Sequence, residues 1–149
     1  MNSIDEVEKS SKVLAYRFII RAGDREIYQI IELYRKAGWW KEPADGPDRL
    51  QRIIAGSHCF LAAEFEDLII GMGRAISDRT SDAYIQDVTV DPDFRGRGIG
   101  TQIVAGIVSH LEKDGLAWIG LIAEKNSHAF YEQLGFKQMD RSVPMLRLS

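Results

Sequence analysis

The sequence predicts an α/β protein of the α+β type, in which helices flank a mixed, mostly antiparallel central sheet with one parallel βαβ unit. Three segments rich in β-forming residues, 59–65, 68–76 and 83–90, follow one another with short polar connections, which is typical of an antiparallel meander. A strongly amphipathic helix and a nearly all-apolar segment, 117–123, come next. That order predicts a right-handed crossover to a parallel strand.

Ahead of the meander we expect one strand and two helices. The run 16–20 is rich in β-formers and predicts the first strand. A helix with apolar residues on one face should follow, capped by the side chain of Asp24 and ended by Gly38. After the loop-like segment 39–47, the apolar spacing predicts a shorter helix over 50–56.

The long helix after the meander should pack its apolar stripe against the sheet. The stripe consists of Ile99, Ile103, Ile107 and Leu111. The segment 117–123 then predicts a strand buried on both faces. A short helix is expected from Asn126 to Gly135, and the segments 136–139 and 145–148 resemble closing strands. In such a sheet, function is expected at the carboxyl ends of the parallel strands.

Length and composition favour one globular domain over residues 1–149, with 1–14 as a flexible N-terminal arm. The net charge of −3 argues against nucleic acid as the main partner. The single Cys59 forms no internal disulfide and has no partner cysteine for a metal site. No signal peptide or membrane-spanning stretch is visible, so we expect a cytoplasmic protein with no membrane partner.

A glycine-rich turn opens the long helix and is the sharpest local signal. Its residues are Arg95, Gly96, Arg97, Gly98, Ile99, Gly100 and Thr101. The start of a helix has free N–H groups and partial positive charge, and glycines let an anion approach them closely. Arginines at the same rim would add charge. The alternative is a tight turn with solvated arginines.

The residues of this turn argue against some classes of phosphate-containing ligand. No lysine follows Gly100, which argues against a nucleoside-triphosphate hydrolase. Thr101 stands where a dinucleotide fingerprint has its third glycine. A nicotinamide-dependent oxidoreductase stays a weaker alternative, because Glu124 could imitate the acidic residue that binds the ribose.

Two motifs together resemble the GNAT superfamily of acetyl-CoA-dependent N-acetyltransferases. They are the stretch 88–100 and, downstream, Asn126 with the stretch 130–136. The resemblance covers about residues 83–139. It implies that the strand before the turn splays from its parallel neighbour, that the pantetheine arm of acetyl-CoA pairs with the free edge, and that the turn binds the pyrophosphate. It also makes a homodimer possible.

The resemblance assigns the cofactor-binding residues. Val88 and Val90 would bind pantetheine through the main chain, the turn would hold the pyrophosphate, and Asn126 would anchor the cofactor arm. The full predicted set is Val88, Thr89, Val90, Arg95, Gly96, Arg97, Gly98, Ile99, Gly100, Thr101, Asn126 and Phe130. No metal is implied, because no His, Cys and carboxylate group shows ligand spacing.

Acetyl transfer to an amine needs a proton donor for the thiolate and a base for the amine. A phenol is protonated at neutral pH, and the resemblance gives the donor role to Tyr131, which could otherwise be a core aromatic residue. Asp87, on the opposite face from Val88 and Val90, is the candidate base. The fallback bases are Glu64 and Glu124, with His58 and His128 behind them.

The acceptor should be a primary amine on a small molecule, a peptide or a protein, reached by direct transfer. The resemblance places its pocket near the first two helices. The candidate wall residues are Tyr28, Tyr34, Trp39, Trp40 and Arg79. A non-catalytic module that binds or senses acyl-CoA is the alternative function, and Tyr131 argues against it.

Overall fold

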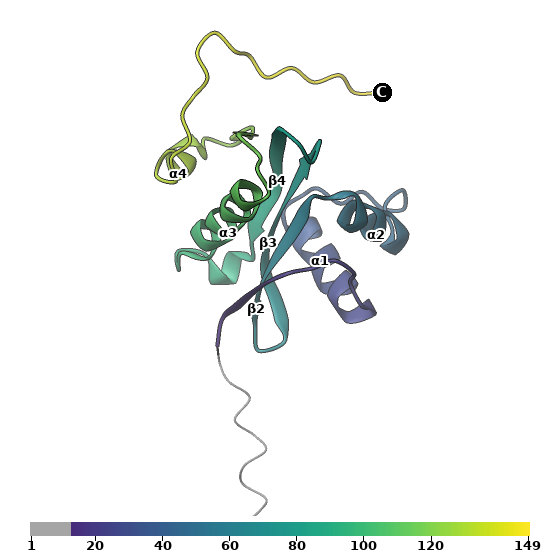
Figure 1. The fold of residues 1–149 in the computed structure, drawn as a ribbon. Coiled ribbons are helices and arrows are strands. Elements are labelled where there is room, and N and C mark those ends of the chain that lie inside the picture. The colour runs from purple at the N-terminus through teal and green to yellow at the C-terminus, as the bar shows by residue number, and fades with distance from the viewer. Residues whose placement is uncertain (1–12) are drawn as a thin grey trace, which may run out of the picture.

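The computed structural model describes residues 13–149, in which helices lie on both faces of one central sheet (Figure 1). The elements are β1 (Ala15–Phe18), α1 (Asp24–Lys36), α2 (Pro47–Gly56), β2 (Cys59–Phe65), β3 (Leu68–Ser77), β4 (Asp82–Val90), the 3-10 turn η1 (Pro92–Phe94), α3 (Ile99–Lys113), β5 (Trp118–Gly120) and α4 (His128–Glu132). None of these helices has the length and apolar character needed to cross a membrane.

The sheet has the order β1-β2-β3-β4-β5. Its neighbours are antiparallel except for β4 and β5, which run parallel on either side of the crossover helix α3. The mixed, mostly antiparallel sheet with one βαβ unit is therefore confirmed. Short connections join antiparallel strands, as in the meander of β2, β3 and β4, whereas the long crossover through α3 allows β5 to run parallel to β4.

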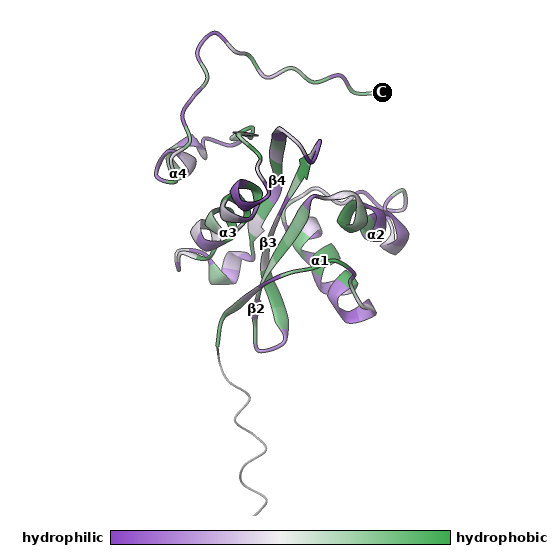
Figure 2. Ribbon diagram, in the orientation of Figure 1, coloured by the Kyte–Doolittle hydropathy of each residue, from purple (hydrophilic) through white to green (hydrophobic). Residues whose placement is uncertain are grey.

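Each face of the sheet has its own core, because strand side chains alternate between the faces. Phe60 and Ala62 of β2 join the apolar faces of α1 and α2. Leu61 and Ala63 point the other way and join the stripe of α3. The apolar ribbon segments accordingly face inward between the helices and the sheet (Figure 2).

A bulge interrupts the pairing of β3 with β4. Arg74 pairs with Gln86 and Met72 pairs with Thr89, so Gly73 alone faces two residues, Asp87 and Val88. Asp87 adopts φ = 56° at this point. The bulge bends β4 beside the start of α3.

The parallel strands separate soon after they begin. Pairing of β4 with β5 covers only Asp82, Ala83 and Tyr84 on the β4 side. From residue 85 to residue 90, β4 has no partner on that side among the described strands. The structure thus has the splay that the family resemblance implied.

Several local predictions are wrong. The N-cap of α1 is Gly23, not Asp24, and the Gly23 N–H donates to the Glu26 carboxylate over 2.8 Å. The strand expected over 117–123 is confined to Trp118–Gly120, and its Trp118 is 45% exposed because no other strand among residues 13–149 covers this edge of the sheet. The helix α4 begins at His128 rather than at Asn126, whose φ of 60° is not helical.

The two closing strands are also absent from the structure of the described residues. The segment from residue 137 to residue 149 contains no helix or strand, and all its residues are exposed. The expected N-terminal arm over 1–14 lies almost wholly outside the described residues, so it stays a prediction.

Candidate functional site

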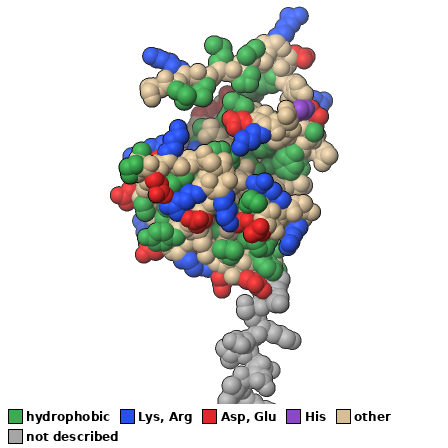
Figure 3. All heavy atoms as spheres, turned by 180° about the vertical axis from the view of Figure 1, so that it is seen from behind, with side chains coloured by type: hydrophobic (Ala, Val, Ile, Leu, Met, Phe, Trp, Pro, Cys, Tyr) green, Lys and Arg blue, Asp and Glu red, His purple; other side chains and the backbone are tan. Residues whose placement is uncertain are grey.

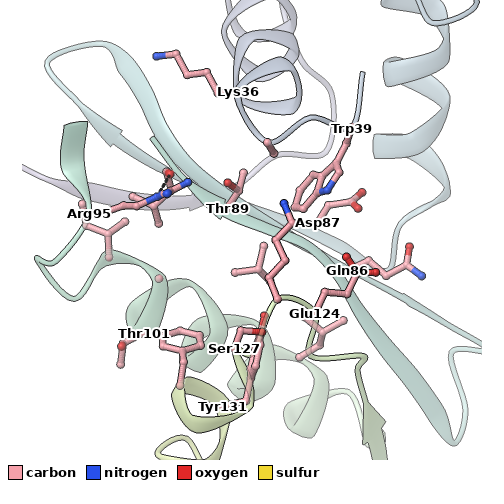
Figure 4. A pocket seen from close by; sticks show the side chains of 18 of the residues that line it. Lys36, Trp39, Gln86, Asp87, Thr89, Arg95, Thr101, Glu124, Ser127 and Tyr131 are labelled. Atoms are coloured by element: carbon pink, nitrogen blue, oxygen red, sulfur yellow. Dashed lines mark hydrogen bonds between the residues drawn. The ribbon is translucent and has the colours of Figure 1, made fainter. Parts of the chain in front are cut away.

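A cavity of about 1060 Å³ opens where β4 separates from β5. Its walls come from the second half of β4, the turn before α3, the chain after β5, helix α4 and the end of α1. Figure 4 shows Tyr131 and Ser127 on one side of this cavity and Trp39 and Asp87 across from them. The cavity therefore lies at the carboxyl end of β4, as expected for this topology.

The unpaired edge of β4 forms one wall. Every residue from 85 to 90 lines the cavity. A strand without a partner has free backbone N–H and C=O groups, which can pair with an extended ligand. Val88, Thr89 and Val90 are thus where the sequence placed them, along an open edge.

The glycine-rich turn forms the next wall and exposes hydrogen-bond donors. Gly96 and Gly98 have φ values of 76° and 78°, in the left-handed region that favours glycine. The first bond of α3 runs from the Gln102 N–H to the Gly98 carbonyl over 3.1 Å. The N–H groups of the three residues between them, 99–101, are consequently left over at the helix start, which suits an anion.

The two arginines of the turn differ in position. Arg95 lines the cavity, and its Nε donates to the Val90 carbonyl over 3.1 Å, which holds the turn against the end of β4 (Figure 4). Arg97 does not line the cavity. Its guanidinium lies 5.3 Å from the centre of the Phe94 ring, a cation–π contact.

The position of Tyr131 fits a proton donor. It lines the cavity, and its ring packs edge-on against Phe130 and Phe136, at centroid distances of 4.9 and 5.9 Å. Burial raises the pKa of Tyr131 above its ordinary value of about 10. No hydrogen bond within residues 13–149 occupies its hydroxyl. The phenol is thus protonated at neutral pH and free to donate.

Asp87 lines the cavity but is held by two donors. Tyr34 Oη and Arg74 Nε donate to the same oxygen, Oδ2, over 2.7 and 2.6 Å. Burial, together with the negative charge of Asp87, raises the pKa of Tyr34, so this phenol keeps its proton. The carboxylate is therefore fixed in place by α1 on one side and β3 on the other.

Lys36 forms a second contact between α1 and the site, and this contact was not predicted from the sequence. Its Nζ lies 2.5 Å from Asp91 Oδ2. Asp91 is 7% exposed and also accepts the Asp93 N–H over 3.0 Å, so it holds η1 in shape. The end of α1 is thereby fixed to the segment that leads into the glycine-rich turn.

The remaining predicted residues divide into two groups. Phe130, Glu124 and Trp39 line the cavity, as do Ile99, Gly100 and Thr101 of the turn. Trp40 packs against Tyr34 instead, with ring centroids 5.8 Å apart. The residues that do not line the cavity are Asn126, Glu64, His58, His128, Tyr28 and Arg79. The cavity is also lined by nine residues that were not predicted from the sequence, namely Lys36, Ala37, Tyr84, Ile85, Gln86, Phe94, Ile122, Lys125 and Ser127.

His58 belongs to a separate cluster outside the cavity wall. Its Nδ1 lies 2.5 Å from Ser77 Oγ, and its Nε2 lies 2.7 Å from Asp114 Oδ2. His110 lies 3.4 Å from the same Asp114 oxygen. Both ring nitrogens of His58 are thus engaged, and the cluster joins the beginning of β2 to the end of α3.

The sequence of this chain is similar to those of several known proteins. The sequence profile of the acetyltransferase (GNAT) family matches residues 25–136. A histone acetyltransferase of Glycine max is 30% identical over 123 residues, which cover 77% of this chain and 53% of that protein. An uncharacterized N-acetyltransferase of Pyropia yezoensis is 26% identical over 136 residues, 87% of this chain and 76% of that protein. The match thus spans only about half of the Glycine max protein.

Solved structures show the same fold at low identity. A GNAT family acetyltransferase from Streptococcus pneumoniae superposes with a TM-score of 0.76 at 18% identity, covering 92% of this chain and 98% of the other. Glucosamine-6-phosphate N-acetyltransferase from Arabidopsis thaliana superposes with a TM-score of 0.71 at 19% identity, covering 91% of this chain and 98% of the other. A protein from Clostridium acetobutylicum described as a predicted acetyltransferase, solved with acetyl-CoA, superposes with a TM-score of 0.68 at 19% identity, covering 90% of this chain and 96% of the other.

Proposed function

The chain belongs to the GNAT family of acetyltransferases, and from this premise we propose that it transfers an acetyl group from acetyl-CoA directly to a primary amine. One observation carries the proposal. A single cavity is lined by a helix start with free N–H groups, an unpaired strand edge and the phenol of Tyr131. Acyl transfer from a diphosphate-bearing thioester needs a binding site for the diphosphate, a groove for the arm and a proton donor.

In this proposal each part of acetyl-CoA has a matching wall. The diphosphate binds at the turn, where the free N–H groups and Arg95 lie. The pantetheine arm pairs with the edge of β4 at Val88 and Val90. Arg97 and Asn126, which the resemblance also assigns to the cofactor, do not line the cavity.

The reaction then needs two proton transfers. The neutral amine attacks the thioester carbonyl, the C–S bond breaks, and the departing sulfur takes the phenolic proton of Tyr131. A simple thiol has a pKa of about 8.5, below that of the phenol, so the Tyr131 hydroxyl stays protonated until C–S cleavage builds charge on the sulfur and the proton is donated in that step. The proton of the amine passes to Asp87, directly or through a water, with Glu124 as the second carboxylate in the cavity. Tyrosine recovers its proton from solvent.

We propose that the acceptor is a primary amine, on a small molecule or on a protein, which binds as the ammonium cation and loses one proton to solvent before it attacks. The wall across from Tyr131 contains the carboxylate of Asp87 and the indole of Trp39, and both attract a cation. Proteins that resemble this chain include a histone acetyltransferase and a glucosamine-6-phosphate N-acetyltransferase, whose names cover both kinds of amine.

Two measurements on purified protein test the proposal. Calorimetry with acetyl-CoA should show binding, and a panel of amines with a thiol-release readout should show turnover. Tyr131→Phe should lower kcat about 100-fold with little change in the Kd for acetyl-CoA, because it removes one proton transfer. Tyr28→Phe is the control, since Tyr28 is 64% exposed and lies outside the cavity wall.

Each adverse result has a separate meaning. Failure to bind acetyl-CoA would overturn the proposed function. Binding without turnover on any amine would favour the non-catalytic acyl-CoA module. Unchanged turnover in Tyr131→Phe would remove this residue from the mechanism while leaving the function intact.

A further inference from the structure

Three side chains that commonly bind metal ions meet where α3 ends beside the beginning of β2. The ligand atoms of His58, His110 and Asp114 all lie within 4.8 Å of one another. None of the three residues lines the large cavity, so this cluster is separate from the candidate site. His58 and Asp114 are 56 positions apart in the sequence, and spacing along the chain therefore does not indicate the cluster.

Both histidines direct the same ring nitrogen toward the same carboxylate oxygen. His110 and Asp114 are four positions apart at the end of α3, a spacing that places two side chains on one face of a helix. His110 Nε2 lies 3.4 Å from Asp114 Oδ2. His58 stands just ahead of β2, and its Nε2 lies 2.7 Å from that oxygen. Two nitrogen ligands and one oxygen ligand therefore converge from two different elements.

The distances within the cluster suit a small tetrahedral ion. Zn²⁺ holds nitrogen and oxygen ligands at about 2.0–2.2 Å, so two of its ligand atoms lie about 3.4 Å apart. The separation of His110 Nε2 and Asp114 Oδ2 already has this value. The separation of His58 Nε2 and Asp114 Oδ2 would have to grow by less than about 1 Å. The Asp114 side chain is 46% exposed, which leaves it room for this movement.

The second ring nitrogen of His58 has the kind of partner that metal-binding histidines have. Such a histidine usually donates its other N–H to a hydrogen-bond acceptor, which fixes the orientation of the ring. His58 Nδ1 lies 2.5 Å from Ser77 Oγ. This hydroxyl oxygen also accepts the Arg79 N–H over 2.9 Å, and its two lone pairs allow both bonds. The His58 side chain is only 5% exposed, so packing also holds its Nε2 toward the other two ligands.

We propose that His58 Nε2, His110 Nε2 and one carboxylate oxygen of Asp114 bind a Zn²⁺ ion, with water as the fourth ligand. Solvent can reach this position because the side chains of His110 and Asp114 are 37% and 46% exposed. The hydrogen bond from His58 holds the pKa of Asp114 below its ordinary value, so this ligand is ionised at neutral pH. The positive charge of Arg79 also acts on Asp114, but its guanidinium donates to the Ser57 carbonyl over 3.4 Å. The bound ion would join the end of α3 to the beginning of β2, whether or not the proposed acetyl transfer is confirmed.

Calorimetric titration of the full chain with ZnCl₂ at neutral pH is the first test, and it should show one ion bound per chain. His110→Ala and Asp114→Ala should each raise the Kd at least about tenfold, because each removes one of three ligands. Both side chains are partly exposed, so these variants disturb the fold less than a change at the buried His58 would. His128→Ala is the matched control, since His128 lies in α4 outside the cluster, and its Kd should equal that of the wild type. Absence of binding, or an unchanged Kd in His110→Ala, would overturn the proposal.

Long-range ¹H–¹⁵N correlation spectra of the histidine rings identify the nitrogens that bind. One equivalent of ZnCl₂ should shift the Nε2 resonances of His58 and His110 and leave those of His128 in place. Excess MgCl₂ should shift none of them, because Mg²⁺ prefers oxygen ligands. On the face seen from behind, Lys and Arg side chains are interspersed with Asp and Glu, so general attraction of cations is weak there (Figure 3). Equal shifts of all three histidines, or loss of Zn²⁺ binding in Cys59→Ser, would contradict the proposed ligand set.

Discussion

Replacing Gly73 by alanine should destabilise the bulge that shapes the cavity. An added Cβ would lie 2.9 Å from Ile103 Cγ2, 3.0 Å from Ile107 Cδ1 and 3.2 Å from Val88 Cγ2. Two of these atoms are γ-methyl groups of β-branched side chains, whose χ1 is stiff, so they cannot turn away without a shift of the backbone. Crowding of this kind in a packed core costs about 1–3 kcal/mol.

Thermal unfolding followed by circular dichroism measures the effect of Gly73→Ala. For a chain of this size, about 1 kcal/mol corresponds to about 2–4 °C, so the Tm should fall by about 2–12 °C. Because Val88 is one of the crowded residues, the Kd for acetyl-CoA should also rise. Gly56→Ala is the control, since nothing lies within 4 Å of its added Cβ at the end of α2, and its Tm should stay or rise. A Tm for Gly73→Ala within 1 °C of the wild type would refute this reasoning.

Three further predictions concern single residues. Gly98→Ala should lower the Tm, because its φ of 78° costs an L-residue about 1–2 kcal/mol, whereas Gly100→Ala, with no positive φ, should melt like the wild type. Burial alone would raise the pKa of Asp91, but hydrogen bonds, above all that from Lys36, hold it below its ordinary value. This carboxylate therefore contributes stability above its unfolded pKa of about 4, and the contribution is lost as the pH falls through the lower folded pKa. Asp91→Asn should melt below the wild type at pH 7, and the difference should shrink as the pH is lowered below 4. Burial raises the pKa of Cys59 to about 11, so at pH 8 the native thiol should react with an aromatic disulfide far more slowly than the unfolded thiol; equal rates would contradict its burial.

The fold was predictable where the signal is local. Alternation and helical spacing of apolar residues identified the meander and the stripe of α3, and short or long connections then decided which strands run parallel. The segments 136–139 and 145–148 show the limit of this reasoning. Residue types indicate that a segment can form a strand, but pairing also requires an edge, and a single sequence does not specify where that edge is.

The candidate site, too, was predictable only where its residues lie close together in the sequence. The glycine-rich turn and Tyr131 lie in compact motifs, so their place in the cavity followed from the sequence. The tie between Lys36 and Asp91 joins residues 55 positions apart, and no local pattern indicates it. The sequence does contain a signal for Arg74, because it is the one charged residue in the strand Leu68–Ser77. A half-buried charged side chain needs a partner, which here is Asp87.

The bulge in β4 shows how a departure from regular structure builds the site. Ala83 and Ile85 face α3, and strict alternation would put Asp87 on that face as well. The extra residue opposite Gly73 shifts the pattern, so that Val88 packs toward α3 and Asp87 turns toward Tyr34 of α1. Without the bulge a carboxylate would be buried in an apolar core. The sequence carries this shift as a spacing of three, rather than two, between the apolar residues at 85 and 88, so the irregular spacing in an otherwise alternating strand is itself the signal for where the cavity forms.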